Sequence, residues 1–320
     1  MAQQSIAVIL PAYNESLTIN AVVEAFHRAL PQALIVVIDN ASVDNTGELA
    51  RNTIERLGCR GLVLEEHYKG KANAIRRAFL EIDADVYLMA DADMTYPADQ
   101  AMELLMPVLE GRCDMTTGDR ITNGEYGEEN KRPAHEFGNK LVRLLINRLF
   151  NAKLNDVLTG YRAMSRRFVK TYPIMVAGFE LETDLTLYAL DGRFRLLEVP
   201  IRYQDRPEGS ISKLNTIRDG ARVLNAIVQI ARHHRPMRFF GGLGLVLFVL
   251  GLAAGYGPLD DYMTSKYVFR LPLAVLAVGL ELSALLSFAT GLILSTIVRG
   301  QRAEHERALL AYRHGPSRDG

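Results

Sequence analysis

Two aspartates stand one residue apart where a short apolar run ends. Residues 86–90 read VYLMA, and Asp91 and Asp93 follow in the stretch DADMTYP. Side chains two residues apart in an extended chain point to the same side, so the two carboxylates can converge. Converging carboxylates repel unless a cation lies between them, and oxygen-only ligands suit Mg²⁺ or Mn²⁺, with substrate phosphates as further ligands. The alternative is an acidic turn that caps a helix beginning near Pro97 and Asp99.

Four short apolar runs predict the strands that position this pair. They are bounded by turn residues and alternate with helical patterns, which indicates βαβ units and a mostly parallel sheet with helices on both faces. The predicted strands cover residues 6–10, 34–38, 61–65 and 86–90, and the predicted helices cover 17–30, 45–57 and 71–82. Ligands bind beyond the carboxyl ends of such strands. Three of these ends carry polar clusters and predict one shared rim: PAYNE (11–15), DNASVDNT (39–46) and DADMTYP (91–97).

Several common site signatures are absent from the sequence. PAYNES contains no glycine and GKANA (70–74) lacks the Walker spacing, which disfavours nicotinamide and P-loop enzymes. The seven histidines are scattered, without a zinc or Ser-His-Asp pattern. Cys59 and Cys113 lie far apart in no metal or redox spacing, as expected in a reducing cytosol. Basic and acidic residues number 37 each, so no net charge favours nucleic acid as a partner.

The C-terminal part of the sequence is mostly apolar and predicts two membrane-spanning helices. Residues 239–257 contain no charge, and residues 271–298 form a longer apolar stretch. A helix of about 20 residues crosses the ~30 Å hydrocarbon core of a bilayer. Arginines cluster before the first stretch and after the second, so the positive-inside rule predicts a hairpin with both ends in the cytoplasm. The alternative is two buried helices of a soluble domain. The N-terminus, without a basic segment, is not typical of a signal peptide.

Two basic amphipathic segments, 135–150 and 216–235, accompany the apolar part. The second leads into the first predicted span and is expected to lie on anionic lipid at the membrane surface. For the first, an interfacial helix and an ordinary core helix remain equally open. Its predicted apolar face consists of Phe137, Leu141, Leu144, Leu145 and Leu149.

Glu281 is an acidic residue inside the second apolar stretch. An intramembrane carboxyl is a candidate functional group. The plainer alternative, which we favour, is a protonated side chain or one satisfied by Ser283, Ser287 or another subunit. Gly251 and Gly255 have a spacing that permits close helix association, including association between copies of the chain.

Further motifs follow the rim clusters in order along the chain. They are YKGKANAIRRAF (68–79), TGDR (117–120), DVLTGYRAMSRRF (156–168), GFELETDL (178–185) and VPIRYQDRPEGSISKL (199–214). With the rim clusters, this array resembles the GT-A glycosyltransferases of family 2 over residues 5–215. The resemblance is to polyprenyl-phosphate glycosyltransferases in particular, such as dolichyl-phosphate mannose synthase and its bacterial relatives.

The resemblance implies an α/β GT-A domain, Rossmann-like with a mostly parallel sheet, followed by interfacial amphipathic helices and a two-helix transmembrane hairpin. It implies an integral protein of a bacterial or archaeal plasma membrane, with the catalytic domain and both termini in the cytoplasm. The expected divisions are a catalytic domain (1–215), a juxtamembrane helix (216–238), transmembrane helices within 239–298 and a tail (299–320).

The resemblance also assigns site residues. Asp91 and Asp93 would form the DXD motif, which binds the donor diphosphate through Mg²⁺ or Mn²⁺, and Asp156 would orient the acceptor or assist the metal. The residues expected to hold the nucleotide-sugar are Pro11, Tyr13, Glu15, Asp39, Lys71, Ala92, Arg206 and Lys213. The candidates for binding the acceptor phosphate are Arg120, Arg132 and Arg162. Glu180 and Glu182 have less certain roles.

The predicted activity is inverting, metal-dependent transfer of one sugar from a UDP- or GDP-sugar to undecaprenyl or dolichyl phosphate at the cytoplasmic membrane face. Such a phosphate is already an anion near neutral pH, so it can attack without a general base. Transfer to another lipid or glycan and a non-catalytic membrane scaffold remain alternatives. A processive synthase is disfavoured because the chain has no tryptophan and only two predicted spans. The family commonly has a second acid at the position of Asn40, a departure that bears on nucleotide preference.

Overall fold

The computed structural model describes residues 4–122, 133–174, 181–203 and 236–313, and the side chains of these residues except 133–139, 308 and 311–313. The chain divides into two compact units, Met1–Thr216 with Ala311–Gly320, and Ile217–Leu310. The predicted domain boundary after residue 215 and the amphipathic segment 216–235 lie outside the described residues.

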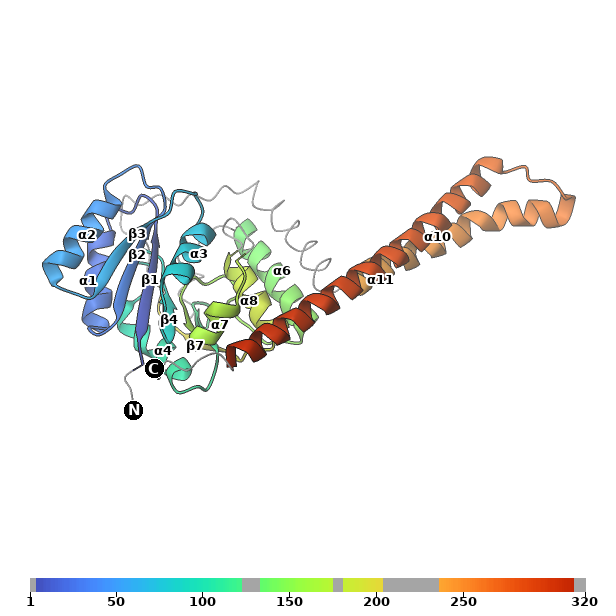
Figure 1. The fold of residues 1–320 in the computed structure, drawn as a ribbon. Helices are drawn as coiled ribbons and strands as arrows, with labels where there is room; N and C mark the ends of the chain where they lie inside the picture. The colour runs from blue at the N-terminus through green and yellow to red at the C-terminus, as the bar shows by residue number, and fades with distance from the viewer. Residues whose placement is uncertain (1–3, 123–132, 175–180, 204–235, 314–320) are drawn as a thin grey trace. The chain divides into compact units, whose positions relative to one another are not determined.

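The first unit is built on one mixed sheet with helices on both faces (Figure 1). In its described part the strand order is β3-β2-β1-β4-β6-β5-β7, and only β6 runs antiparallel to its neighbours, β4 and β5. The mostly parallel sheet of the sequence prediction is confirmed. The strands are β1 (Ile6–Ala12), β2 (Leu34–Asp39), β3 (Gly61–Glu65), β4 (Val86–Met89), β5 (Met115–Asp119), β6 (Arg162–Ser165) and β7 (Leu196–Pro200).

The helices of the first unit alternate with the first four strands as predicted. Their bounds are α1 (Ile19–Ala29), α2 (Thr46–Leu57), α3 (Lys71–Glu81), the 3₁₀ turn η1 (Ala98–Gln100), α4 (Ala101–Leu109), α6 (Pro133–Phe150), α7 (Arg166–Thr171) and α8 (Leu181–Asp191). Helix α1 shows why the spacing of apolar residues predicts a helix. One buried stripe at helical spacing is formed by Ile19, Val22, Val23 and Phe26. Full burial of each such side chain stabilises the fold by about 1.5–3 kcal/mol.

The three polar rim clusters lie at neighbouring strand ends. Strand β1 pairs in parallel with β2 on one side and with β4 on the other. The register places Ala12 beside Asp39 and Ile9 beside Met89, so β1, β2 and β4 all deliver their following loops to the same edge of the sheet. The shared edge was expected from the alternation of strands and helices, and the pairing of β1 with β2 and β4 brings the three clusters to neighbouring positions on it.

Helix α6 differs in detail from its predicted apolar face. Val142 and Ile146 are its buried residues among those described, whereas Leu144 is 63% exposed. Phe137 lies outside the described side chains. The buried side of α6 contacts α8, and the amide of Asn147 bonds both the N–H and the C=O of Leu154, which fastens the following loop. The apolar face is therefore rotated from the expected one, because residues beyond the helix decide which side is covered.

The second unit contains two long apolar helices, α10 (Pro236–Ser265) and α11 (Leu271–Arg313). Both are long and apolar enough to cross a membrane, and only 11% of the most apolar window of each is buried. Such exposure does not fit the alternative of two buried core helices. The helices include the predicted spans, and α11 continues into the segment expected to be a tail.

Small residues form the contact between α10 and α11. A Cβ added at Gly244 would lie 3.0 Å from the Phe288 ring, and one at Gly255 would lie 3.5 Å from Ala277. The contacts pair the start of α10 with the later part of α11, so the helices form an antiparallel hairpin. Gly255 thus contributes to packing within the chain.

The carboxyl of Glu281 lies against Gly251, where an added Cβ would be 2.6 Å from Oε1. Ser283 donates its hydroxyl proton to the carbonyl of Gly279, and Ser287 donates to that of Phe240. Neither serine therefore satisfies Glu281, contrary to one form of the plainer expectation. Within the described residues, Oε1 is buried without a hydrogen-bond partner.

Candidate functional site

An ion-pair cluster lies at the rim, formed by Lys71, Asp91 and Glu182. Lys71 is the first residue of α3, Asp91 follows β4 and Glu182 lies in the first turn of α8. The ammonium pairs with Oδ1 of Asp91 and lies 2.6 Å from Oε1 of Glu182. Burial alone would lower the pKa of Lys71, but the charges of Asp91 and Glu182 outweigh it and raise the pKa above its usual value. Lys71 therefore remains a cation at neutral pH.

Gly160 allows this cluster to form. It lies in the loop before β6, and a Cβ at this position would be 2.9 Å from Nζ of Lys71 and 3.0 Å from Oδ2 of Asp91. Its N–H donates to the hydroxyl of Tyr96 at 2.8 Å. The glycine of the sequence motif DVLTGYR is therefore explained by the lack of space for a side chain beside Lys71 and Asp91, which the sequence did not reveal.

Asp93 lies in a different environment from Asp91. It is buried, and its Oδ1 accepts hydrogen bonds from the backbone N–H and the hydroxyl of Thr95 at 3.2 and 2.6 Å. Met94 between them has a positive φ of 66°, which turns the chain sharply after Asp93. The carbonyl of Ala92 accepts from the hydroxyl of Thr18 at 2.7 Å, which ties the turn to α1.

The donor atoms at this turn fit a hard divalent cation. Carboxylate oxygens suit Mg²⁺ and Mn²⁺, and Mg²⁺ is often held by one or two carboxylates together with substrate phosphates. In the described part of the chain no group of three or more His, Cys, Asp or Glu residues could hold a metal by itself. A metal at Asp91 and Asp93 would consequently depend on a phosphate ligand for much of its coordination.

The neighbouring strand ends carry the residues expected to contact a nucleotide. The ammonium of Lys69 donates to the hydroxyl of Tyr13 at 3.2 Å and lies 5.2 Å from the ring centre. Oδ1 of Asp39 accepts from the N–H of Ser42 at 3.2 Å, and the absence of a side chain at Gly47 lets α2 begin against its carboxylate. These polar groups lie at the ends of β1 and β2, beside the Asp91 turn.

The loop around Glu15 is tied to the same edge. Its N–H donates to the hydroxyl of Thr46 at 2.9 Å, which joins the end of β1 to the start of α2. Pro11 forms part of β1 and is partly buried. Both positions lie where the sequence predicted them, at the rim.

Asn40 has a role that its position in the sequence did not suggest. It is buried, its Nδ2 donates to the carbonyl of Tyr68 at 2.7 Å, and its Oδ1 accepts from the N–H of Gly70 at 2.7 Å. Both halves of the amide are used, so an aspartate could not replace it without losing a donor. Asn40 thereby holds the segment that carries Lys69 and leads into Lys71.

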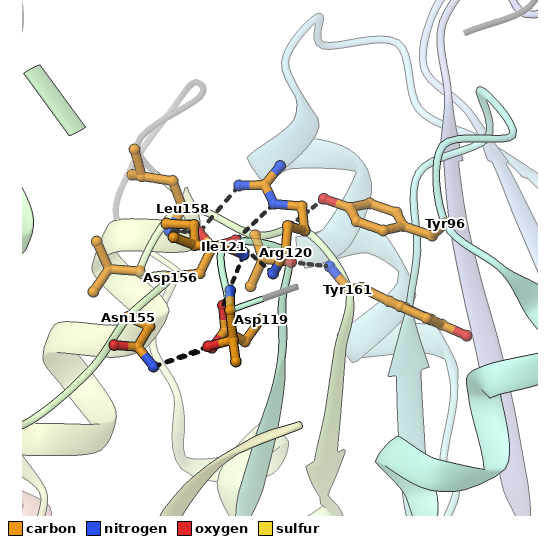
Figure 2. A network of polar contacts seen from close by, with 12 residues as sticks. Tyr96, Asp119, Arg120, Ile121, Asn155, Asp156, Leu158 and Tyr161 are labelled. Carbon is orange, nitrogen blue, oxygen red and sulfur yellow. Dashed lines mark hydrogen bonds and ion pairs between the residues drawn. The ribbon is translucent and has the colours of Figure 1, made fainter. Parts of the chain in front are cut away.

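A second charged network joins β5 to the loop before β6 (Figure 2). The guanidinium of Arg120 forms a forked pair with Asp156 at 2.7 and 3.1 Å, and their side chains are only 10% and 3% exposed. Glu198 of β7 accepts from the backbone N–H groups of Asn155 and Asp156. Burial is the main reason that the pKa of Glu198 is raised, although these two hydrogen bonds oppose it. Asp156 is thus fixed through both its side chain and its backbone.

Asp119 belongs to the same network as the Arg120–Asp156 pair, because it bonds the side chain of Asn155. Its carboxylate accepts from the N–H groups of Ile121 and Thr122 and from the side chains of Thr122 and Asn155. Burial would raise the pKa of Asp119, but these hydrogen bonds outweigh it and lower the pKa.

Arg162 does not lie where an acceptor phosphate could reach it. Its side chain is fully buried, and its guanidinium donates to the carbonyls of Thr159 and Val157 and to the hydroxyl of Thr186. Its expected role is therefore corrected: it fastens the loop between residues 156 and 162 to α8. The expected residues Arg132, Arg206, Lys213 and Glu180 lie outside the described part of the chain.

Comparison with known proteins identifies the family. The family model described as Glycosyl transferase family 2 matches residues 7–172. Glycosyltransferase AglJ of Haloferax volcanii is 30% identical over 267 residues, which cover 83% of each protein. The dolichyl-phosphate hexose transferase of the same organism is 29% identical over 230 residues, covering 72% of this chain and 95% of that protein.

A solved structure supports the fold. Glucosyl-3-phosphoglycerate synthase from Mycobacterium tuberculosis, in complex with Mn²⁺, UDP and phosphoglyceric acid, superimposes with a TM-score of 0.55 and 21% identity, covering 71% of this chain and 79% of that one. The chain belongs to glycosyl transferase family 2, and it is a glycosyltransferase with a GT-A fold.

Proposed function

We propose that this glycosyltransferase transfers one sugar, with inversion, from a UDP- or GDP-sugar to a polyprenyl phosphate at the cytoplasmic face of a membrane. The observation that supports the proposal is the rim: the neighbouring strands β2, β1 and β4 end at the same edge of the sheet, with Asp39, Tyr13 and the Asp91–Asp93 turn at or just after those ends. The name of the Haloferax dolichyl-phosphate hexose transferase supports the acceptor class. The exposed apolar helices α10 and α11 support a membrane anchor.

On the donor side, Asp91 and Asp93 would hold Mg²⁺ or Mn²⁺ together with the diphosphate. The ion would neutralise the negative charge that develops on the leaving nucleoside diphosphate. Tyr13, Glu15 and Asp39 would hold the base and ribose. Lys71 would remain close to the diphosphate, because it contacts Asp91.

On the acceptor side, the chain needs cations more than a base. A polyprenyl phosphate can attack the anomeric carbon as an anion, so residues that attract and orient it are sufficient. Arg120 and Arg132 remain the proposed cations. Since Arg120 already pairs with Asp156, the two side chains would act together in orienting the acceptor.

A transfer assay on the full chain in detergent tests this proposal. Radiolabelled UDP- and GDP-sugars would be offered with undecaprenyl or dolichyl phosphate, in Mg²⁺, Mn²⁺ or chelator. Label that enters the organic phase with one donor, and only with metal, is the expected result. Nucleotide release without lipid product would indicate another acceptor. Metal-dependent binding of a donor without turnover would favour the scaffold alternative.

The variant Asp93→Asn tests the metal assignment within this assay. Because a metal-bound carboxylate is lost, we expect transfer to be abolished in Mg²⁺ and in Mn²⁺ alike. Turnover equal to that of the wild type would show that Asp93 is not a ligand.

A further inference from the structure

Lys71 lies between two carboxylates that come from distant parts of the chain. Its side chain is 13% exposed, that of Glu182 is 8% exposed, and that of Asp91, the more accessible carboxylate, is 29% exposed. Without Lys71, two acidic groups would face each other across a small, largely buried space. The ammonium is therefore the shared counter-ion of the two carboxylates.

The ammonium also occupies one of the two oxygens through which Asp91 could bind another cation. Lys71 pairs with Oδ1, and a Cβ added at Gly160 would lie 3.0 Å from Oδ2. A lysine ammonium and a divalent ion on the same carboxylate would repel each other, because like charges at close range in a partly buried site are weakly screened. Asp91 cannot hold both at full strength.

We propose that Lys71 is an exchangeable counter-ion of Asp91. In the absence of metal, Lys71 holds Asp91 and Glu182 together. When Asp91 binds a divalent cation, Lys71 loses its ion pair with Asp91 and keeps its ion pair with Glu182. The pair with Glu182 holds the ammonium beside the donor diphosphate. This inference rests on the proposed metal site, and it assigns Glu182 as a positioning residue that holds Lys71 after the exchange.

The arrangement has two consequences with opposite signs. Removing Lys71 frees Asp91, so a metal should bind more tightly to the protein without nucleotide. Removing the negative charge of Glu182 leaves Lys71 with Asp91 as its remaining partner in the cluster, so a metal should bind less tightly. The second effect requires Lys71 and should largely disappear when Lys71 is also absent.

Mn²⁺ binding to the full chain in detergent, measured by electron paramagnetic resonance without nucleotide, tests these consequences. We expect Lys71→Met to tighten binding roughly tenfold, in line with the loss of one close positive charge. Glu182→Gln should weaken it a few-fold, and the double variant should resemble Lys71→Met. Lys69→Met is the matched control, because Lys69 contacts Tyr13 and has no carboxylate partner in the described structure; it should leave Mn²⁺ binding nearly unchanged.

Three results would overturn the inference. Unchanged or weaker Mn²⁺ binding in a folded Lys71→Met variant would show that the ammonium does not compete. An equal loss of Mn²⁺ affinity from Glu182→Gln in the presence and in the absence of Lys71 would identify Glu182 as a direct metal ligand. No Mn²⁺ binding by the wild type, even with UDP present, would remove the proposed metal site as well. If Lys71→Met fails to fold, stronger or unchanged binding in Glu182→Gln overturns the exchange by itself.

Discussion

Two largely buried cationic side chains of the first unit, Lys71 and Arg120, pair with carboxylates in different ways. Lys71 divides one ammonium between Asp91 and Glu182, whereas Arg120 forms a forked, two-bond pair with the carboxylate of Asp156. An ammonium is a compact charge with rotatable donors, and a guanidinium is a rigid, planar fork. The first arrangement can change partners with little movement, and the second cannot.

The surroundings of the two pairs reinforce this difference. Asp91 is partly open to solvent, whereas Asp156 is buried and its backbone is held by Glu198. A site that binds and releases a charged donor needs the first kind of pair. A loop that must stay in place while substrates exchange needs the second kind. The variants Asp156→Asn and Asp91→Asn separate these two roles.

Asp156→Asn should have the largest effect, and the effect should be on stability. Loss of the carboxylate leaves the buried guanidinium of Arg120 without its charge partner, which typically costs about 3–5 kcal/mol. Urea unfolding of the full chain in detergent, followed by circular dichroism, measures it. Glu110→Gln, which breaks an exposed pair with Arg112, should cost at most about 1 kcal/mol. Equal losses in the two variants would remove the distinction between a locked pair and an ordinary one.

Asp91→Asn should affect activity far more than stability. Because the proposed metal ligand is lost, transfer should fall by about 10²–10³-fold, the range found when one group that stabilises developing charge is removed. Lys71 keeps Glu182 as a charge partner, so the free energy of unfolding should fall by less than the ~3–5 kcal/mol expected for Asp156→Asn. Measuring the turnover rate and urea unfolding on the same preparation tests both halves. A large loss of stability would place Asp91 with Asp156 as a structural residue.

Asn40→Asp should weaken the support of Lys71 without touching the Arg120 pair. The variant loses the donor to Tyr68 and places a carboxylate near that carbonyl, which should cost about 1–3 kcal/mol of stability. Displacement of the segment before α3 should raise the KM for the nucleotide-sugar more than it lowers kcat.

Asn73→Asp is the matched control for this change. Asn73 is partly exposed, and among the described residues its side-chain amide donates only to the carbonyl of Lys69, at 3.1 Å. We expect little change in KM or stability. If Asn73→Asp raised the KM as much as Asn40→Asp does, the hydrogen bonds of Asn40 with Tyr68 and Gly70 would not be the reason for the higher KM.

The smallest predicted effect concerns Asp119 and pH. Its pKa is lowered in the folded protein, so its stabilising contribution is present above the unfolded pKa, near ~3.9, and is lost as pH falls through the folded pKa. Asp119→Asn should lower stability on the order of 1 kcal/mol at pH 7, with a smaller difference from wild type in strong acid. Urea unfolding at several pH values checks the sign. A difference that grows with acidity would contradict the assignment.

The elements of the N-terminal half could be predicted because their signals are local. Residues 34–38 form an uninterrupted apolar run, and the buried residues of α1 repeat every three or four positions, so each segment shows its secondary structure in its own sequence. The two long apolar helices follow from length and composition in the same way. The antiparallel insertion of β6 between β4 and β5 was not predicted, because it depends on pairing between segments far apart in the chain.

The candidate site divides along the same line. Sequence alone predicted that polar clusters follow three parallel strands, and thereby that Asp91 and Asp93 stand at the rim. The pairing of β1 with both β2 and β4, which makes these strands neighbours, was decided by the tertiary structure. Tertiary structure decided which charged side chains form ion pairs. Lys71 is 111 residues from Glu182, and no spacing in the sequence predicts their contact. It also separated Arg120 near the rim from Arg162 in the interior, although both are arginines within family motifs. Local sequence sets what each side chain can bond, but burial and long-range packing determine which partner it finds.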